Sequence, residues 1–227
     1  MVSDAYKLFF EWVSVFFVLY MIGYASFLFL SVAVGSSELY KTKKRNKLKS
    51  ELPGGYYVPV SIVIPAHNEE VTIVESVRSL LSLEYRLYEI IVVDDGSSDN
   101  TSEEVCKAFN MHKINRPIQK KIACQPEEVV YESHGWKVPI TLIRKKNGGK
   151  ADALNMGINA SKYPYFICMD ADSALQYDSL EKIVAPVLED ASVIAVGGAV
   201  RPSNGTEIEN GRVSSYKMPN KLIPSMQ

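Results

Sequence analysis

Two aspartates stand one residue apart in the sequence, directly after an apolar run. Asp170 and Asp172 follow the letters YFICM, and Ala171 separates them. Carboxylates so placed in the turn after a strand can both point their oxygens at a hard divalent cation. Mg²⁺ and Mn²⁺ commonly take one or two carboxylates together with phosphate oxygens. The pair therefore predicts a Mg²⁺ or Mn²⁺ site that serves a nucleotide diphosphate.

Two further polar clusters follow apolar runs. The first begins at Pro65 and reads PAHNEE; the second begins at Asp94 and reads DDGSS. Each cluster alone has a structural alternative, because an aspartate after a strand often only caps the next helix. Ligands of open parallel sheets gather beyond the carboxyl ends of the strands, so three clusters at one edge favour a binding site. His67 is interpreted as a hydrogen-bonding residue, because the sequence supplies no partner that would orient it as a base.

A glycine-rich segment opens the third helix that the sequence predicts. Gly148 and Gly149 precede Lys150, and the free amides of a helix N-terminus beside an ammonium group suit a phosphate. An ordinary helix start after a glycine turn is the alternative. The segment lacks the spacing of a Walker loop, and no G-x-G-x-x-G follows the first strand, which excludes the dinucleotide-binding fingerprint.

Elements of a parallel α/β sheet must position these residues, since short apolar runs alternate with helical patterns. The predicted strands are residues 61–65, 89–94, 140–144, 165–170 and 192–197. The predicted helices are residues 71–81, a segment that begins near Asp99, residues 150–160 and residues 180–188. Residues 111–136 have no clear period and are interpreted as an insertion before the third strand.

The N-terminal segment predicts a membrane helix. Residues 12–37 contain no charged side chain, and about 20 apolar residues cross a bilayer as a helix. A cleaved signal peptide is the alternative, but its apolar core is shorter and its leading segment is basic. Six basic residues follow between Lys41 and Lys49, which places the following domain in the cytoplasm by the positive-inside rule and favours contact with anionic membrane lipid.

The overall composition narrows the choice of partners. A net charge of −1 gives no basic field for nucleic acid, so no nucleic-acid partner is expected. The chain has three cysteines without C-x-x-C spacing, which indicates reduced thiols rather than disulfides or zinc. Cys168 lies within the fourth predicted strand and is expected to be buried.

The motifs in their order resemble the family 2 glycosyltransferases, which have the GT-A fold. The strings are IVIPAHNEE, IIVVDDGSSDNT, KNGGKADALN and ICMDADS, and the resemblance covers residues 61–205. The strings NGGKADALNMGINAS and VGGAVRPSNG look like the membrane-bound branch of poly-N-acetylglucosamine, cellulose and hyaluronan synthases. The resemblance implies a Rossmann-like, mostly parallel sheet flanked by helices, after one transmembrane helix. The expected parts are an anchor (1–37), a basic linker (38–59), a nucleotide-sugar-binding domain (60–205) and the start of an acceptor-side segment (206–227).

The resemblance also implies roles for single residues. Asp95 would contact the uracil or ribose of a nucleotide sugar, and Lys150 would lie near the base or diphosphate. Asp172 would bind the metal most directly, with Asp170 nearer the ribose or sugar. The remaining donor-binding residues would be Pro65, Ala66, Asn68 and Glu69.

The activity implied is an inverting, metal-dependent transfer of a hexosyl group from a nucleotide-diphospho sugar, with UDP as the expected nucleotide, to a glycan acceptor. The base of such a transfer would lie in a TED-type motif, which we expect beyond Gln227, so no catalytic residue is assigned here. A partner chain could supply that half. The alternatives are a catalytically silent nucleotide-sugar-binding membrane subunit and a nucleotidyltransferase of related sheet topology.

Overall fold

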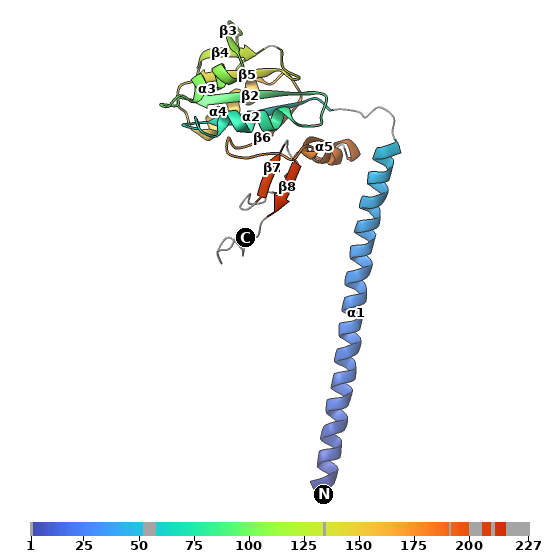
Figure 1. Ribbon diagram of the computed structural model, residues 1–227. Helices are drawn as coiled ribbons and strands as arrows, with labels where there is room; N and C mark the ends of the chain where they lie inside the picture. The colour runs from blue at the N-terminus through green and yellow to red at the C-terminus, as the bar shows by residue number, and fades with distance from the viewer. Residues whose placement is uncertain are drawn as a thin grey trace. The chain divides into compact units, whose positions relative to one another are not determined.

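The computed structural model describes residues 2–51, 58–133, 135–190, 192–199, 206–209 and 212–216. The chain divides into two compact units, Met1–Tyr56 and Tyr57–Gln227. Figure 1 shows their elements. The first unit contains the helix α1, and the second contains the sheet and the remaining elements.

The N-terminal unit is one long helix, α1 (Val2–Glu51). Within it, Tyr6–Ser37 has a mean hydropathy of 2.2 and none of its most apolar window is buried. Ser26 and Ser31 donate to the carbonyls of Ile22 and Phe27, which satisfies their hydroxyls within the helix. The segment is long and apolar enough to cross a membrane, and a signal sequence passes the same test. The backbone helix continues through the basic residues as far as Glu51.

The second unit contains a six-stranded sheet with the order β3-β4-β5-β2-β1-β6. Its parallel part consists of β1 (Val60–Ala66), β2 (Tyr88–Asp95), β5 (Ile140–Lys145) and β6 (Tyr165–Cys168). β3 (Met111–Ile114) and β4 (Glu127–Ser133) extend it as antiparallel strands. A separate pair is formed by β7 (Thr206–Glu209) and β8 (Arg212–Tyr216). The sheet confirms the predicted α/β class with a mostly parallel order.

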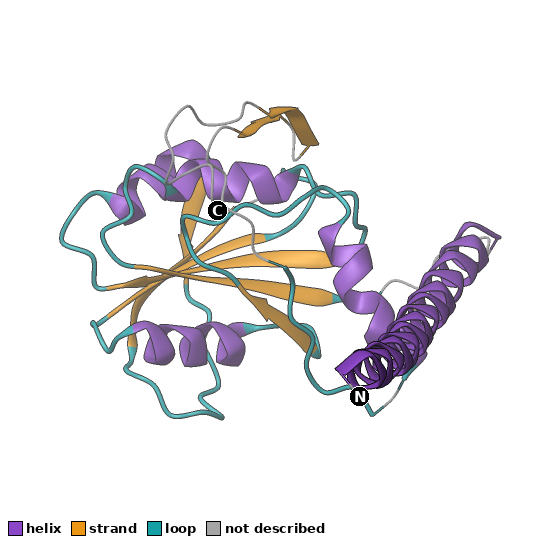
Figure 2. Ribbon diagram, turned by 90° about the horizontal axis from the view of Figure 1, so that it is seen from below, coloured by secondary structure: helices purple, strands orange, loops and turns teal. Residues whose placement is uncertain are grey.

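Helices cover both faces of the sheet (Figure 2). The helices α2 (Ile73–Leu81), α3 (Thr101–Ala108) and α5 (Ser179–Glu189) contribute to one core cluster, and α4 (Lys150–Ala160) contributes to the other. Successive strand residues alternate between the clusters: Ile62 and Ile64 belong to the first and Val63 to the second. This alternation is the period of two that a strand imposes, and it explains why strands covered on both faces read as continuous apolar runs.

The close approach of α4 to β1 depends on a glycine. A Cβ atom on Gly157 would lie 2.2 Å from Cγ1 of Val63, well inside van der Waals contact. Gly157 and Val63 are both buried. The missing side chain lets α4 lie directly on the sheet, with its first residue, Lys150, beyond the carboxyl ends of the strands.

Three expectations from the sequence differ from the structure. Residues 193–199 form no strand, and Ile194 is 99% exposed; an apolar run needs a neighbouring strand to pair with, and the described residues offer this one none. The presumed insertion at 111–136 contains β3 and β4, whose half-exposed positions mask the apolar alternation. Cys168 is exposed rather than buried, and all three cysteines are free.

Candidate functional site

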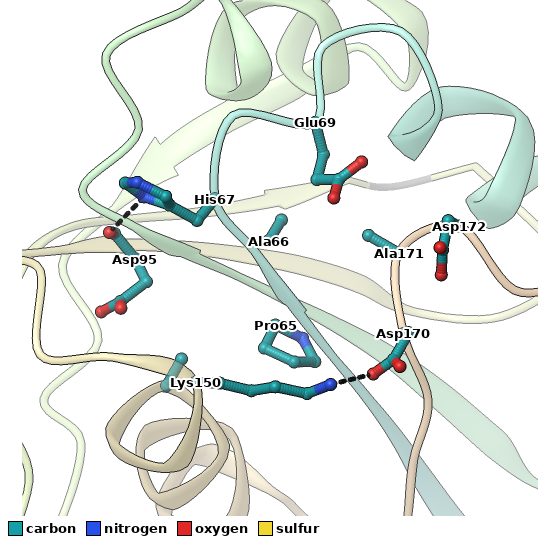
Figure 3. A pocket seen from close by; sticks show the side chains of 10 residues that line it. Pro65, Ala66, His67, Glu69, Asp95, Lys150, Asp170, Ala171 and Asp172 are labelled. Atoms are coloured by element: carbon teal, nitrogen blue, oxygen red, sulfur yellow. Dashed lines mark hydrogen bonds and ion pairs between the residues drawn. The ribbon is translucent and has the colours of Figure 1, made fainter.

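A pocket of about 250 Å³ opens beyond the carboxyl ends of the parallel strands. Its residues come from the end of β1 and the segment after it, the end of β2, the first turn of α4 and the turn after β6 (Figure 3). Its lining consists of Pro65, Ala66, His67, Glu69, Asp95, Lys150, Ala153, Asp170, Ala171 and Asp172. The parallel order brings these segments to one edge, because parallel strands all end on the same side of a sheet.

Asp95, the last residue of β2, is 3% exposed and its carboxylate is held on both oxygens. Its Oδ1 accepts hydrogen bonds from the ammonium group of Lys145 and from the amide of Gly148 at 3.0 Å. Its Oδ2 accepts from the amide of Gly149 at 2.7 Å. A carboxylate has about four acceptor positions. Asp95 therefore retains room for about one further donor from a bound molecule.

Lys145 is fully buried at the end of β5, and no sequence motif pointed to it. Its ammonium group contacts Asp95 and also lies 2.7 Å from Oδ2 of Asp152 in the first turn of α4. Burial works to lower the pKa of Lys145, but hydrogen bonds from its ammonium group to Asp152 and Asp95, together with their charges, raise the pKa above its ordinary value. The hydrogen bond from Lys145 lowers the pKa of Asp152. Lys145 thus stays a cation inside the protein.

The loops after β1 and β2 are joined by polar contacts. Asn68 has a positive φ of 58°, and its side-chain carbonyl accepts from the amide of Ser98 at 2.8 Å. The Asn68 amide donates to Ser97 Oγ at 3.0 Å. Asn68 lies beside the pocket and is not part of its lining, so its position suits holding the loop more than touching a ligand.

The buried neighbour Asp94 has a structural role. Its Oδ1 accepts from the amide of Ser97 at 2.8 Å, and its Oδ2 accepts from the hydroxyl of Ser102 at the start of α3. Asp94 therefore holds the turn after β2 against the start of α3, whereas Asp95 accepts the amides that precede α4.

His67 lines the pocket, although the sequence indicated only a hydrogen-bonding role for it. Its Nδ1 lies 3.0 Å from the backbone carbonyl of Asp95, a contact that favours the tautomer with the proton on Nδ1. Nε2 is then the ring acceptor. The sequence signal for a place of His67 in the pocket was its position in the PAHNEE string, between residues predicted to bind the donor.

The turn that carries the two aspartates is anchored at its middle residue. Ala171 is buried, and its carbonyl accepts a hydrogen bond from the hydroxyl of Ser76 on α2. The amide of Met169 donates to the carbonyl of Val63 at 3.1 Å. Asp170 and Asp172 are both exposed. The anchored alanine thus leaves both neighbouring carboxylates accessible at the pocket.

Lys150 reaches across the pocket to one of these carboxylates. Its Nζ lies 2.5 Å from Oδ1 of Asp170, and both side chains are more than half exposed (Figure 3). An ion pair so exposed contributes little to stability. Both groups therefore remain available to a bound molecule at little cost in stability.

Two exposed carboxylates at the pocket could serve as ligands of a metal. Asp170 and Asp172 line the pocket, and the described residues contain no group of three or more His, Cys, Asp or Glu side chains that could hold a metal. Mg²⁺ is usually bound by one or two carboxylates together with waters and substrate phosphates. The pair fits a cation shared with a phosphate ligand and does not form a cage that would hold the cation alone.

A mostly parallel sheet with helices on both faces and an acidic pocket beyond its strand ends defines this protein as an open-sheet α/β protein. Comparison with known families is more specific. The family described as "Glycosyl transferase family 2" matches residues 61–123 and 126–225. The chain belongs to this family, as its motifs indicated, and the match extends beyond the range that they covered.

Curated relatives agree with this assignment. The poly-beta-1,6-N-acetyl-D-glucosamine synthase of Staphylococcus aureus strain COL is 28% identical over 197 residues, which are 83% of this chain and 40% of that protein. The synthase of Staphylococcus epidermidis is 31% identical over 152 residues, which are 66% of this chain and 30% of that protein. The chain thus spans about two-fifths of the length of the Staphylococcus aureus relative.

Solved structures show a looser likeness. TarS 1-349 of Staphylococcus aureus has a TM-score of 0.44 and 21% identity, over 66% of this chain and 40% of that chain. The mannosyltransferase PcManGT of Pyrobaculum calidifontis, solved with GDP-Man and Mn²⁺, has a TM-score of 0.46 and 22% identity, over 70% of this chain and 42% of that chain.

Proposed function

We propose that this chain binds the nucleotide-diphospho sugar donor of a glycosyl transfer, with UDP as the nucleotide and Mg²⁺ or Mn²⁺ as the cofactor. The observation that carries the proposal is the charge of the pocket. Glu69, Asp170 and Asp172 contribute three carboxylates and Lys150 one ammonium group, while Asp95 shares the charge of Lys145 with Asp152. The excess negative charge favours a divalent cation and, without one, would repel a diphosphate.

In this proposal, different residues bind different parts of the donor. Asp95 offers its remaining acceptor position to an N–H or O–H group of the base or ribose. Pro65, Ala66 and Glu69 form the rest of that part of the pocket, and Asn68 holds its loop. Lys150 approaches the diphosphate from the N-terminus of α4, where free amides also favour an anion. Asp172 is the main metal ligand and Asp170 lies nearer the ribose or sugar.

The size of the pocket fits part of a donor. Its volume of about 250 Å³ lies just below the roughly 300–1,000 Å³ of typical small-molecule sites. Donor and acceptor together need more space, so the acceptor is expected to bind outside these walls. The expected reaction is an inverting hexosyl transfer to a polysaccharide or glycan, in which the cation neutralises the departing diphosphate. We assign no described residue the role of base, and a further segment or a partner chain is expected to supply it.

The similarity to the poly-beta-1,6-N-acetyl-D-glucosamine synthases supports a polysaccharide as the product and an N-acetylhexosamine as the sugar. The apolar segment Tyr6–Ser37 supports anchoring in the cell membrane, with the sheet unit in the cytoplasm where nucleotide sugars are made. The basic residues after this segment suit contact with anionic lipid headgroups.

The test is calorimetric titration of UDP into the full chain in detergent micelles, with and without Mn²⁺. We expect binding with Mn²⁺ and at least tenfold weaker binding without it, which corresponds to about 1.4 kcal/mol. Asp172→Asn should abolish the Mn²⁺ dependence and leave the unfolding midpoint unchanged. Glu75→Gln, an exposed carboxylate on α2 paired with Arg78, is the matched control and should bind as the wild type does.

Two results would contradict the proposal. UDP that fails to bind the folded wild-type chain in the presence of Mn²⁺ would refute the donor site. An Asp172→Asn variant with unchanged, Mn²⁺-dependent affinity would remove Asp172 from it. GDP titrated in parallel tests the choice of nucleotide.

A further inference from the structure

A buried lysine connects three segments that the pocket depends on. All three donors of the Lys145 ammonium group are used: by Oδ1 of Asp95, by Oδ2 of Asp152 at 2.7 Å and by the carbonyl of Lys146 at 2.7 Å. Asp95 ends β2, Asp152 lies in the first turn of α4, and Lys145 ends β5. One cation thus fixes the end of one strand against the start of a helix.

The two carboxylates extend this network through backbone amides. Asp95 accepts from the amides of Gly148 and Gly149, at 3.0 and 2.7 Å. Asp152 accepts the amide of Gln125 on both of its oxygens, at 3.0 and 3.1 Å. The turn between β5 and α4 is therefore wrapped around the Asp95 carboxylate, and the segment before β4 is tied to the first turn of the helix.

We propose that Lys145 is a positioning residue of the donor pocket: its charge attracts both Asp95 and Asp152 and offsets their mutual repulsion, and it so holds Asp95 and Lys150 in the pocket wall. The effect on donor binding rests on the proposed function, whereas the contacts of Lys145 do not depend on it. Lys145 does not line the pocket and acts through Asp95 and Lys150, which do.

The charges explain why a lysine is needed here. Without the ammonium group, the buried carboxylate of Asp95 and the partly exposed carboxylate of Asp152 would be left without their shared cation, and removal of one partner of a buried ion pair is strongly unfavourable. The repulsion would be relieved by movement of the residue 146–150 turn, because its glycines restrain it little. Gly149 already has a positive φ of 88°, which only glycine adopts readily. Movement of this turn would carry Lys150 away from Asp170 and open the Asp95 carboxylate to solvent.

The experiment compares variants of the full chain in detergent micelles. Lys145→Met removes the charge and keeps most of the apolar stem. Lys145→Met combined with Asp152→Asn also removes the repulsion, and the new amide can donate toward Asp95. Lys120→Met, which breaks the ion pair with Glu127 at 2.8 Å, is the matched control because it removes a lysine of the same unit that does not line the pocket.

Affinity for UDP with Mn²⁺ should fall at least tenfold in Lys145→Met and stay within twofold in Lys120→Met. The double variant should bind UDP at least threefold more tightly than Lys145→Met does. Such a rescue is the signature of charge balance, because a defect in packing alone would grow with the second substitution. Unchanged affinity in Lys145→Met, or a double variant weaker than the single one, would overturn the inference.

Hydrogen exchange of the backbone separates this inference from the proposed function. The amides of Gly148 and Gly149 should exchange at least tenfold faster in Lys145→Met, while those in the middle of β1 stay protected. If the wild-type chain binds no UDP, the donor site fails and this measurement alone decides the role of Lys145. If Lys145→Met does not fold, Lys145→Gln, which keeps an uncharged donor, replaces it, and unaltered exchange at both glycines then refutes the proposal.

Discussion

Gly157→Ala is the substitution whose effect follows most directly from the packing of α4 on the sheet. The new Cβ would lie 2.2 Å from Cγ1 and 3.2 Å from Cγ2 of Val63. Val63 is completely buried in β1, so its side chain has no free space to move into. Carbon atoms pack best about 3.5–4.0 Å apart, which requires α4 to move outward by roughly 1.5 Å. Because Lys150 and Ala153 sit on the same helix, the shift would reach the pocket.

The expected loss of stability comes from two opposing effects. Overpacking a well-packed core costs about 1–3 kcal/mol. Replacing glycine by alanine inside a helix returns about 1 kcal/mol. The balance predicts that the free energy of unfolding falls by up to about 2 kcal/mol. UDP affinity should fall with it, since the wall formed by α4 is displaced.

Urea unfolding followed by the fluorescence of Trp136 measures this change, in a Trp12→Phe background so that only the sheet unit is seen. Trp136 suits the purpose because its Nε1 donates to the carbonyl of Phe109 at 3.2 Å and loses this contact on unfolding. Combining Gly157→Ala with Val63→Ala gives the new methyl group space, so the pair should be at least about 1 kcal/mol more stable than the sum of the single effects. A Gly157→Ala protein more stable than the wild type would refute the reasoning, since only the gain in helix propensity would then be present.

Two further predictions concern other parts of the chain. Burial raises the pKa of Tyr88 from 10.0 to about 12. The stability that the protonated Tyr88 contributes is therefore intact below pH 10 and is lost as the pH rises from 10 toward 12. In unfolding measured between these pH values, Tyr88→Phe should show a smaller alkaline loss of stability than the wild type, and an identical pH profile would contradict the prediction. The Tyr6–Ser37 segment should keep the chain in the pellet when membranes are extracted with alkaline carbonate, and its release into the soluble fraction would contradict a membrane anchor.

Three parallel strands, β1, β2 and β5, could be predicted from the sequence because they are buried on both faces. Such strands read as continuous apolar runs, and the ends of β1, β2 and β5 were each predicted within one residue. α4 was predicted with the bounds that it has. The antiparallel strands β3 and β4 were missed because half-exposed positions admit charged residues such as Glu127 and Lys113, which erase the apolar signal.

The candidate site was predictable where a motif places a side chain directly at a strand end. Asp95, Lys150, Asp170 and Asp172 all line the pocket. Lys145 was not found, because its role comes from contacts with residues 50 positions before it and seven after it, which no local pattern reveals. The alternation of side chains along a strand was the available signal. Thr141, Ile143 and Lys145 fall on one face of β5, so this alternation points Lys145 into the core, where a charged group needs a partner.

The carboxylates at the two ends of the pocket differ in burial and in their pairing with lysines, and this difference bears on donor recognition. Asp95 is buried, paired with a lysine and held by two amides before any ligand arrives. A group fixed in this way loses little freedom on binding, so it suits selection of an uncharged part of the donor. Asp170 and Asp172 are exposed, and Lys150 pairs with only one of them. In the proposed donor complex, their charge would be matched by a cation bound together with the diphosphate. We infer that the buried end chooses the nucleotide and that the exposed end controls whether its phosphates can bind, so substitutions at Asp95 should change nucleotide preference and those at Asp172 the metal dependence.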